Sequence, residues 1–461
     1  MSAVSSQLSM DPIAGYLEKH AEPEAMLAEA FEGSFGHAIE VPAYGETDSL
    51  FETLAAVPEG PQGDVLIVVV LNARGDSPDE VHEANRVARE RIAAVAPVSV
   101  VSKTPDIRLF RHPRGRLLLI DRALPGDYLP AGQGIGLARK IGCDLMLCLQ
   151  AGGRLASPWI HATDADVRLP NDYFGQIGAV DSKATSAALY FFEHRFPEEE
   201  DLAEAGRLYE ISLRYGTLGL AWAGSPYAYE SLGSCLAVTP WAYAAVGGFP
   251  RRNSIEDFTI ANDLAKIGSI ERLAGSSIEL EGRISTRVPI STGQTLSKLV
   301  GKRGAAAGFE LHHPIVFAHL AAWLRVLGAI ARRGGDLEAP LQQLPHANPF
   351  FRADLLEEAL GQMGAFEKVR EAIAEPGDEE TILRRLHAGF DAFATRRLLD
   401  ELRDAGLPSI GFREALSEAP FTGLAASTED DLETLRLFLA EEEKGLSVVP
   451  AGIPSVELDR A

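Results

Sequence analysis

The first part of the chain alternates short apolar runs with amphipathic segments. Residues 37–42 form a short apolar run, and an amphipathic helix is expected to start near Thr47 or Asp48, which are both suitable capping residues. Residues 65–71, VLIVVVL, are apolar on both faces, as expected for a central strand of a parallel sheet covered by helices. Another helix follows from about Pro78. This order of elements predicts an α/β fold, a sheet flanked by helices.

Polar side chains follow these strands where each one ends. Ligands of α/β sheets bind beyond the carboxyl ends of the strands, and both Asn72 and the loop from Ala43 to Glu46 share that edge. A third apolar segment, SPWIHATDADV, is interpreted as a strand that ends at Asp164 and Asp166. Residues two apart on an extended chain point to the same side, so these carboxylates can converge on Mg²⁺ or Mn²⁺. The alternative is that they cap the next turn.

A helix is predicted from residue 135 to about Gly152 and Gly153, because its apolar residues recur at intervals of three and four. The glycines just before it, at 132, 134 and 136, resemble a dinucleotide-binding loop only loosely, since no clear strand precedes them. We therefore disfavour a dinucleotide site, although the start of this helix can still receive a phosphate.

A second pair of acids stands at the start of a later helix. Ile260, Leu264 and Ile267 mark the expected buried face of this helix, which places Glu256 and Asp257 in its first turn. The helix dipole stabilises carboxylates there. A capping role alone also accounts for the pair.

Helical patterns dominate both ends of the chain. Residues 11–32 suggest one or two short helices, and helical segments fill the chain beyond about residue 305. We expect an N-terminal helical segment at 1–36, an α/β domain at 37–304 and a helical C-terminal domain at 305–461. Formation of a homodimer is one role expected of the C-terminal helices.

Composition narrows the function classes. With 461 residues and a formal net charge of −23, the chain lacks the basic surface that nucleic acid or anionic lipid would require. Its three cysteines form no metal or disulfide pattern, which favours the cytoplasm. The apolar segment 314–333 is interrupted by His319 and Arg325, so we interpret it as a core or interface helix and expect no integral membrane segment.

A local basic cluster stands out in this acidic chain. It surrounds a Ser/Thr/Gly turn that starts a helix, and its members are Arg283, Arg287, Lys298, Lys302 and Arg303. Such a cluster can hold a phosphate or an anionic acceptor. It can equally be a surface patch that pairs with nearby acids.

Four segments that contain these features follow one another along the chain: VPAYGE at 41–46, ARKIG at 138–142, DAD at 164–166 and VGGFPRRNSIEDF at 246–258. Together they resemble the nucleotide-sugar transferases of glycosyltransferase family 2, of the soluble bacterial type, which have a GT-A fold. The likeness covers about residues 37 to 300. It implies a Rossmann-like mixed sheet, with the helical C-terminal domain outside the matched region.

The resemblance implies a donor site along the sheet edge. Pro42, Ala43 and Glu46 correspond to the loop that lines the nucleotide pocket in the family. Asn72 stands where the family commonly has an aspartate that faces the base or ribose, which leaves the nucleotide open. The donor-binding residues implied further along the chain are Arg139, Lys140, Asp164 and Arg287.

The resemblance also assigns metal and catalytic roles. Asp164 and Asp166 match the DxD positions, with Asp166 the more direct ligand of Mn²⁺ or Mg²⁺. Asp257 matches the general base of inverting members, and Glu256 would orient it or bind acceptor hydroxyls. His312 corresponds to a region from which some relatives supply an extra metal ligand, although a histidine in such a loop need not bind metal.

The sequence thus predicts a cytoplasmic, metal-dependent hexosyltransferase that moves a sugar from a nucleotide-diphosphate donor to an acceptor hydroxyl. A non-catalytic nucleotide-sugar-binding or scaffold protein is the alternative outside enzymology. A sugar-phosphate nucleotidylyltransferase shares the general fold and metal use. It would usually carry Arg and Lys in a glycine-rich loop after the first strand, which PAYGETDSL lacks.

Overall fold

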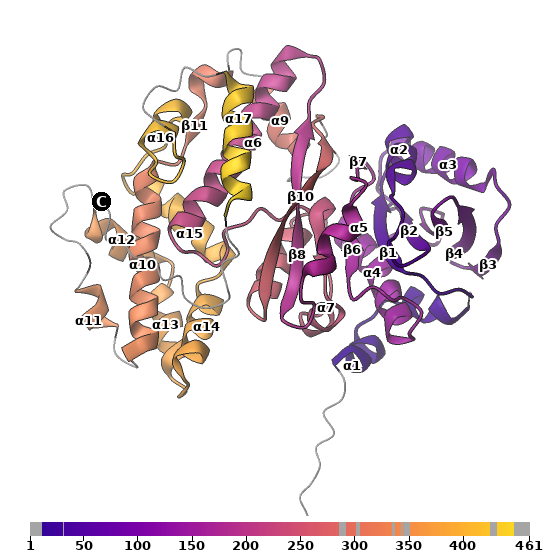
Figure 1. The fold of residues 1–461 in the computed structure, drawn as a ribbon, viewed down its shortest axis with the longest axis horizontal. Helices are drawn as coiled ribbons and strands as arrows, with labels where there is room; N and C mark the ends of the chain where they lie inside the picture. Colours follow the sequence, from indigo (N-terminus) through magenta and orange to yellow (C-terminus); the bar gives the residue numbers. More distant parts are fainter. Residues whose placement is uncertain are drawn as a thin grey trace, which may run out of the picture. The chain divides into compact units, whose positions relative to one another are not determined.

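The chain folds into two compact units, which are described separately (Figure 1). The computed structural model describes residues 12–30, 32–284, 292–300, 305–333, 337–342, 344, 351–424 and 431–446. Within these ranges, the sheet unit takes in residues 12–195 and 231–281, and the helical unit takes in residues 196–230, 282–284 and 292–446.

A 10-stranded mixed sheet forms the centre of the sheet unit, in the order β3-β4-β5-β2-β1-β6-β9-β8-β10-β7. The strands are β1 (His37–Ala43), β2 (Val65–Asn72), β3 (Ser99–Lys103), β4 (Asp106–His112), β5 (Gly115–Arg122), β6 (Ile160–Ala162), β7 (Val167–Arg168), β8 (Thr185–Arg195), β9 (Leu236–Val238) and β10 (Ser269–Glu281). β5, β2, β1 and β6 are parallel neighbours, whereas β9 runs antiparallel to β6 and β8.

β1 and β2 occupy the middle of this sheet, and all of their residues are buried. They pair in parallel along their whole length, with Val41 opposite Val69. Proline in a central strand usually costs a ladder hydrogen bond. Pro42 avoids this cost because β6 pairs only with Ile39 and Glu40, so the missing N–H lies past the end of β6.

The helices of the sheet unit are α1 (Pro12–Lys19), η1 (Pro23–Ala30), α2 (Asp48–Ala56), α3 (Asp79–Ala93), α4 (Ile135–Ala151), α5 (Tyr173–Gln176), η2 (Ile177–Ala179), η3 (Gly233–Cys235), α7 (Pro240–Ala245) and α8 (Glu256–Ala265). Of these, α2, α3, α4 and α8 begin close to where the sequence predicts them. The predicted α/β class, a mixed sheet flanked by helices with a helical C-terminal region, is confirmed.

Two sequence-based expectations about local structure are wrong. β6 ends at Ala162, so Asp164 and Asp166 lie in the loop between β6 and β7, where alternation along an extended strand does not apply. α8 ends at Ala265, and Ile267, expected on its buried face, is 40% exposed.

The helical unit is built around α10 (Pro314–Arg333) (Figure 1). The other elements are α6 (Glu200–Trp222), α9 (Thr292–Val300), η4 (Ala305–Gly308), β11 (Glu310–Leu311), α11 (Glu338–Leu341), α12 (Ala353–Gln362), α13 (Ala365–Ile373), α14 (Glu379–Gly389), α15 (Ala392–Asp404), β12 (Ile410–Gly411), α16 (Phe412–Glu418) and α17 (Leu432–Lys444). Phe317, Leu320 and Trp323 of α10 are almost fully buried in one continuous core. Among the described helices α10 alone has the length and composition of a membrane span, and most of it is buried.

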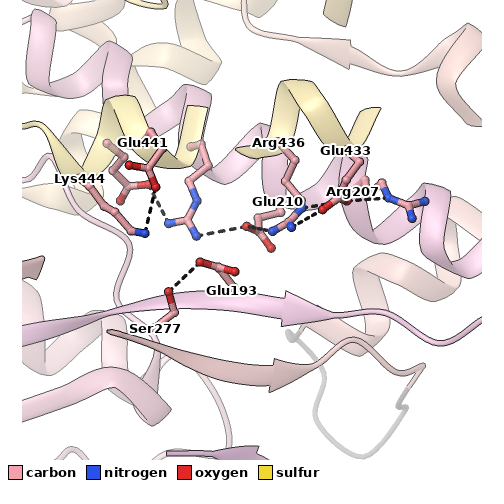
Figure 2. Close-up of polar contacts among 10 residues, drawn as sticks. Glu193, Arg207, Glu210, Ser277, Glu433, Arg436, Glu441 and Lys444 are labelled. Atoms are coloured by element: carbon pink, nitrogen blue, oxygen red, sulfur yellow. Dashed lines mark hydrogen bonds and ion pairs between the residues drawn. The ribbon is translucent and has the colours of Figure 1, made fainter. Parts of the chain in front are cut away.

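A buried ion network joins α6 to α17 within the helical unit (Figure 2). Arg214 of α6 is fully buried and donates to Glu443 of α17 at 2.8 Å and to Glu210 at 3.2 Å. Arg436 of α17 donates to the same Glu210 at 2.9 Å. The sequence analysis expected one domain to run from residue 37 to residue 304. In the structure, residues 196–230 belong to the same compact unit as the C-terminal helices.

We expect Arg214→Met to lower the free energy of unfolding by about 3–5 kcal/mol, because it strips Glu210 and Glu443 of a partner inside the protein. Arg207→Met is the matched control on the same helix, since Arg207 is partly exposed and pairs with Glu433. Its cost should stay below about 1 kcal/mol. Chemical denaturation of the whole chain measures both, and equal losses would contradict a special role for the buried network.

Candidate active site

The guanidinium of Arg139 on α4 lies among acidic side chains, and two of these, Asp164 and Glu256, were predicted from the sequence. Its side chain is almost fully buried. Nε donates to Glu256 Oε1 at 3.2 Å, and Nη1 donates to the backbone oxygen of Thr163 at 2.9 Å. Nη2 donates to Asp164 Oδ1, while Nη1 lies 3.5 Å from Glu40 Oε2. Arg139 therefore connects β1, the loop after β6 and the start of α8.

Two glycines make room for this arrangement. A Cβ atom at Gly142, one turn along α4 from Arg139, would lie 2.3 Å from Cγ of Glu40. A Cβ atom at Gly233 would lie 2.2 Å from Arg139 Nη2. Gly142, the glycine of the ARKIG segment, thus leaves room for Glu40, which pairs with Arg139 of the same segment.

Backbone geometry fixes the acidic pair at the start of α8. Ile255, the residue before Glu256, has a φ of 55°, a left-handed conformation that is strained for a β-branched side chain. Asp257 accepts two backbone N–H groups, from Gly233 at 2.9 Å and from Phe258 at 2.7 Å. The side chains of Glu256 and Asp257 are thereby held in place before any ligand binds.

Burial and charge shift the pKa values of these groups in a consistent direction. Burial raises the pKa of Glu40 to about 8 and that of Glu256 to about 7, although Arg139 opposes both shifts. Burial likewise raises the pKa values of Asp164 and Asp257, again against Arg139. Among the residues that the structure describes, these four carboxyl groups share Arg139 as a cationic partner, and such an environment stabilises a proton or a further cation.

Glu40 was missed by the sequence analysis. It stands in the middle of β1, is fully buried, and its Oε1 has no hydrogen-bond partner among the described residues. An acid inside an otherwise apolar strand was the available signal, because such a group needs a partner or a proton. Its partner is almost a hundred residues away in the chain, so the sequence alone did not identify it.

The start of α4 is closed by the segment before α8. The N–H of Gly134 donates to Asn253 Oδ1, and the N–H of Gly136 donates to the backbone oxygen of Arg252 at 2.9 Å. Both of these N–H groups therefore have protein partners, and phosphate binding at this helix start stays a prediction.

Both DxD carboxylates are partly exposed. The side chain of Asp164 is 33% exposed and its Oδ1 accepts a hydrogen bond from Arg139, and Asp166 lies in the following turn. Among the described residues, no group of three or more His, Cys, Asp or Glu side chains is arranged to hold a metal ion. Two carboxylates fit Mg²⁺ or Mn²⁺ only as part of a site completed by phosphate oxygens and water.

His312 is placed in the helical unit. Its Nε2 lies 3.8 Å from Asp400 Oδ1, its backbone oxygen accepts the Tyr215 hydroxyl, and burial lowers its pKa. The structure does not gather it with Asp164 and Asp166 inside one unit.

The predicted donor-binding residues have different surroundings. Pro42 and Ala43 end β1, and Glu46, just beyond, accepts the Ser49 hydroxyl at 2.7 Å. The Asn72 side chain donates to the backbone oxygens of Ala43 and Val70 at 3.0 and 3.2 Å. Asn72 therefore ties two strand ends together, a structural use of the position where the family has an aspartate.

The two basic residues of ARKIG point into different environments. Lys140 donates to Asp144 at 3.0 Å and to the Tyr16 hydroxyl, in a cluster separate from the four acids around Arg139. Arg287, together with Lys302 and Arg303 of the basic cluster, lies outside the described residues.

Comparisons with known proteins leave the family open. No protein-family model and no curated protein matches the chain. Among solved structures, a mannosyltransferase from Pyrobaculum calidifontis in complex with GDP-Man and Mn²⁺ is similar at 16% identity and a TM-score of 0.30, over 82% of this chain and 93% of that one. TarS 1-349 of S. aureus is similar at 12% identity and a TM-score of 0.31, over 80% and 90%. Likenesses this distant do not identify an activity.

The pH dependence of stability should report the protonated state of Glu40. Because its pKa is raised to about 8, the folded chain retains a proton that the unfolded chain releases above its ordinary value of 4.5. This contribution is complete at low pH and is lost as the pH rises toward 8. Glu40→Gln mimics the protonated form, so its stability relative to wild type should rise by up to about 1.4 kcal/mol per pH unit across that window. Denaturation curves that stay parallel would contradict this assignment.

Proposed function

We propose that the protein transfers a sugar from a nucleotide-diphosphate donor to an acceptor hydroxyl. The observation that carries this proposal is the convergence on Arg139 of Asp164 and Glu256, with Asp257 beside them. These acids come from the DAD and SIEDF segments, and the arginine comes from ARKIG. Three of the four segments that resemble family 2 transferases therefore meet at one place beyond the carboxyl end of β6.

The metal-binding role falls to Asp166, supported by Asp164. Asp166 is half-buried in the turn after Asp164, whose Oδ1 is occupied by Arg139. A bound Mn²⁺ or Mg²⁺ would neutralise charge that develops on the diphosphate leaving group. Asp164 and Asp166 repel each other electrostatically, and a divalent cation bound by both would relieve this repulsion.

Asp257 is the proposed general base. The acceptor oxygen forms a bond to the anomeric carbon, the bond from that carbon to the diphosphate oxygen breaks, and the electron pair leaves with the nucleoside diphosphate. The acceptor proton passes to Asp257, whose pKa is raised by burial, which makes the carboxylate a stronger base. Displacement in one step inverts the anomeric centre. Glu256, which accepts a hydrogen bond from Arg139, orients the neighbouring Asp257.

The finer assignments follow the same proposal. We place the protein among the hexosyltransferases of family 2 and in the cytoplasm, and we assign the helical unit to acceptor selection or dimerisation. A scaffold protein would bind the donor without turnover, whereas a nucleotidylyltransferase would release pyrophosphate from a nucleoside triphosphate. Product analysis separates all three.

A panel of nucleotide sugars, each with and without Mn²⁺, should raise the melting temperature for one donor only when metal is present. At about 100 times Kd, such binding stabilises the folded chain by about 2.7 kcal/mol. Asp166→Ala should abolish the metal-dependent part of the shift, and chelation of Mn²⁺ should do the same in wild type. A donor that shifts both proteins equally would refute the metal role of Asp166.

With the donor identified, Asp257→Asn should lower kcat by about 10²–10⁴ while donor binding persists, because the amide cannot accept the acceptor proton. Asp263→Asn is the matched control on the same helix, since Asp263 is partly exposed and pairs with Lys266. This control should retain wild-type turnover. Nearly full activity of Asp257→Asn would rule out Asp257 as the base.

A further inference from the structure

The N-terminal segment closes over a buried carboxylate on α4. Asp144 is fully buried and accepts hydrogen bonds from the Tyr16 hydroxyl at 2.7 Å, the Tyr243 hydroxyl at 2.8 Å and the backbone N–H of Glu22 at 2.7 Å. Lys140 adds a fourth donor at 3.0 Å. One carboxylate therefore joins α1, the residue before η1, α4 and α7. All four of these donors belong to the sheet unit.

The same N-terminal residues contact the segment that follows α7, residues 246–255, here called the α8 approach. At Gly248, which has a φ of 73°, a Cβ atom would lie 2.2 Å from the Tyr16 hydroxyl, so only glycine fits beneath this side chain. Three residues later, Arg251 pairs with Glu22 at 2.7 Å. Tyr16 and Glu22 thus contact the approach at two points.

The far end of the α8 approach leads directly to the acidic pair. Its Arg252 and Asn253 cap the first turn of α4, and Ile255 adopts the left-handed conformation that begins α8. Glu256 comes next and pairs with Arg139. A strained backbone of this kind persists only where its surroundings hold it. The contacts that hold it come from α4 on one side and from the N-terminal segment on the other.

We propose that Tyr16 and Glu22 are positioning residues, which fix the α8 approach and through it the placement of Glu256 and Asp257. The N-terminal segment therefore acts as a clamp on the acidic pair. The catalytic part of this inference rests on the proposed glycosyl transfer, whereas the structural part does not.

Hydrogen exchange tests the clamp without any assumption about activity. Glu22→Gln removes the ion pair with Arg251 but keeps the backbone N–H that binds Asp144, and Tyr16→Phe removes one hydroxyl. In both variants, amides of residues 247–258 should exchange about tenfold faster than in wild type. Glu24→Gln is the matched control, because Glu24 lies in the same N-terminal segment but pairs with Arg122 at the end of β5. Its exchange in this segment should match wild type.

Unchanged exchange in both Glu22→Gln and Tyr16→Phe overturns the clamp. A double-mutant cycle sharpens the test, since Arg251→Gln should reproduce the Glu22→Gln effect and the double variant should add nothing to it. Additive effects would show that the Arg251 pair does not transmit the constraint.

Kinetics then test the catalytic consequence. Glu22→Gln should lower kcat about tenfold with little change in the KM for the donor, and should shift the pH profile of kcat, because misplacement of the base affects the chemical step. Glu24→Gln should do neither. A tenfold effect on exchange with wild-type kcat and pH profile refutes the positioning role. Faster exchange in a protein that shows no transfer even as wild type refutes the proposed function but leaves the clamp intact.

Discussion

Burial of the Arg139 guanidinium among carboxyl groups is the interaction on which the site depends. A buried charge without partners is very costly, so Arg139 needs the oxygens of Glu40, Asp164 and Glu256 around it. Since these oxygens come from β1, the loop after β6 and α8, the requirement of one side chain fixes the relative positions of three segments. Gly142 and Gly233 meet the same requirement by leaving space that any other residue would fill.

Within the described residues, the gathering of several acids around Arg139 gives the site its chemistry. Burial raises the pKa values of Glu40, Asp164, Glu256 and Asp257, while Arg139 only partly offsets the shifts. A cluster of buried acids favours a proton, a metal ion or both. In the proposed reaction both are used, since Asp257 would take up a proton and Asp166 would help to hold a divalent cation.

α4 links the site to the N-terminal segment through consecutive residues. Neighbouring residues on a helix point about 100° apart, so Arg139 and Lys140 serve different clusters. Arg139 faces the acids, and Lys140 lies with Asp144 and Tyr16. The ARKIG segment predicted both Arg139 and Lys140 in the donor site, because a sequence motif gives only the order of residues along the chain. The direction in which each side chain points is set by the helix. The N-terminal segment thereby becomes part of the support of the site.

Local patterning in the sequence determined the α/β class, the buried strand at 65–71, the helix starts near Asp48 and Ile135, and the acidic pair at the start of α8. These features depend on hydrophobic periodicity over a few residues. Tertiary structure alone decided that Glu40 faces Arg139, that Asn72 turns toward the backbone, that β6 stops at Ala162 and that α6 packs in the helical unit. Each of these depends on contacts between segments far apart in the chain, whose energies no local pattern contains.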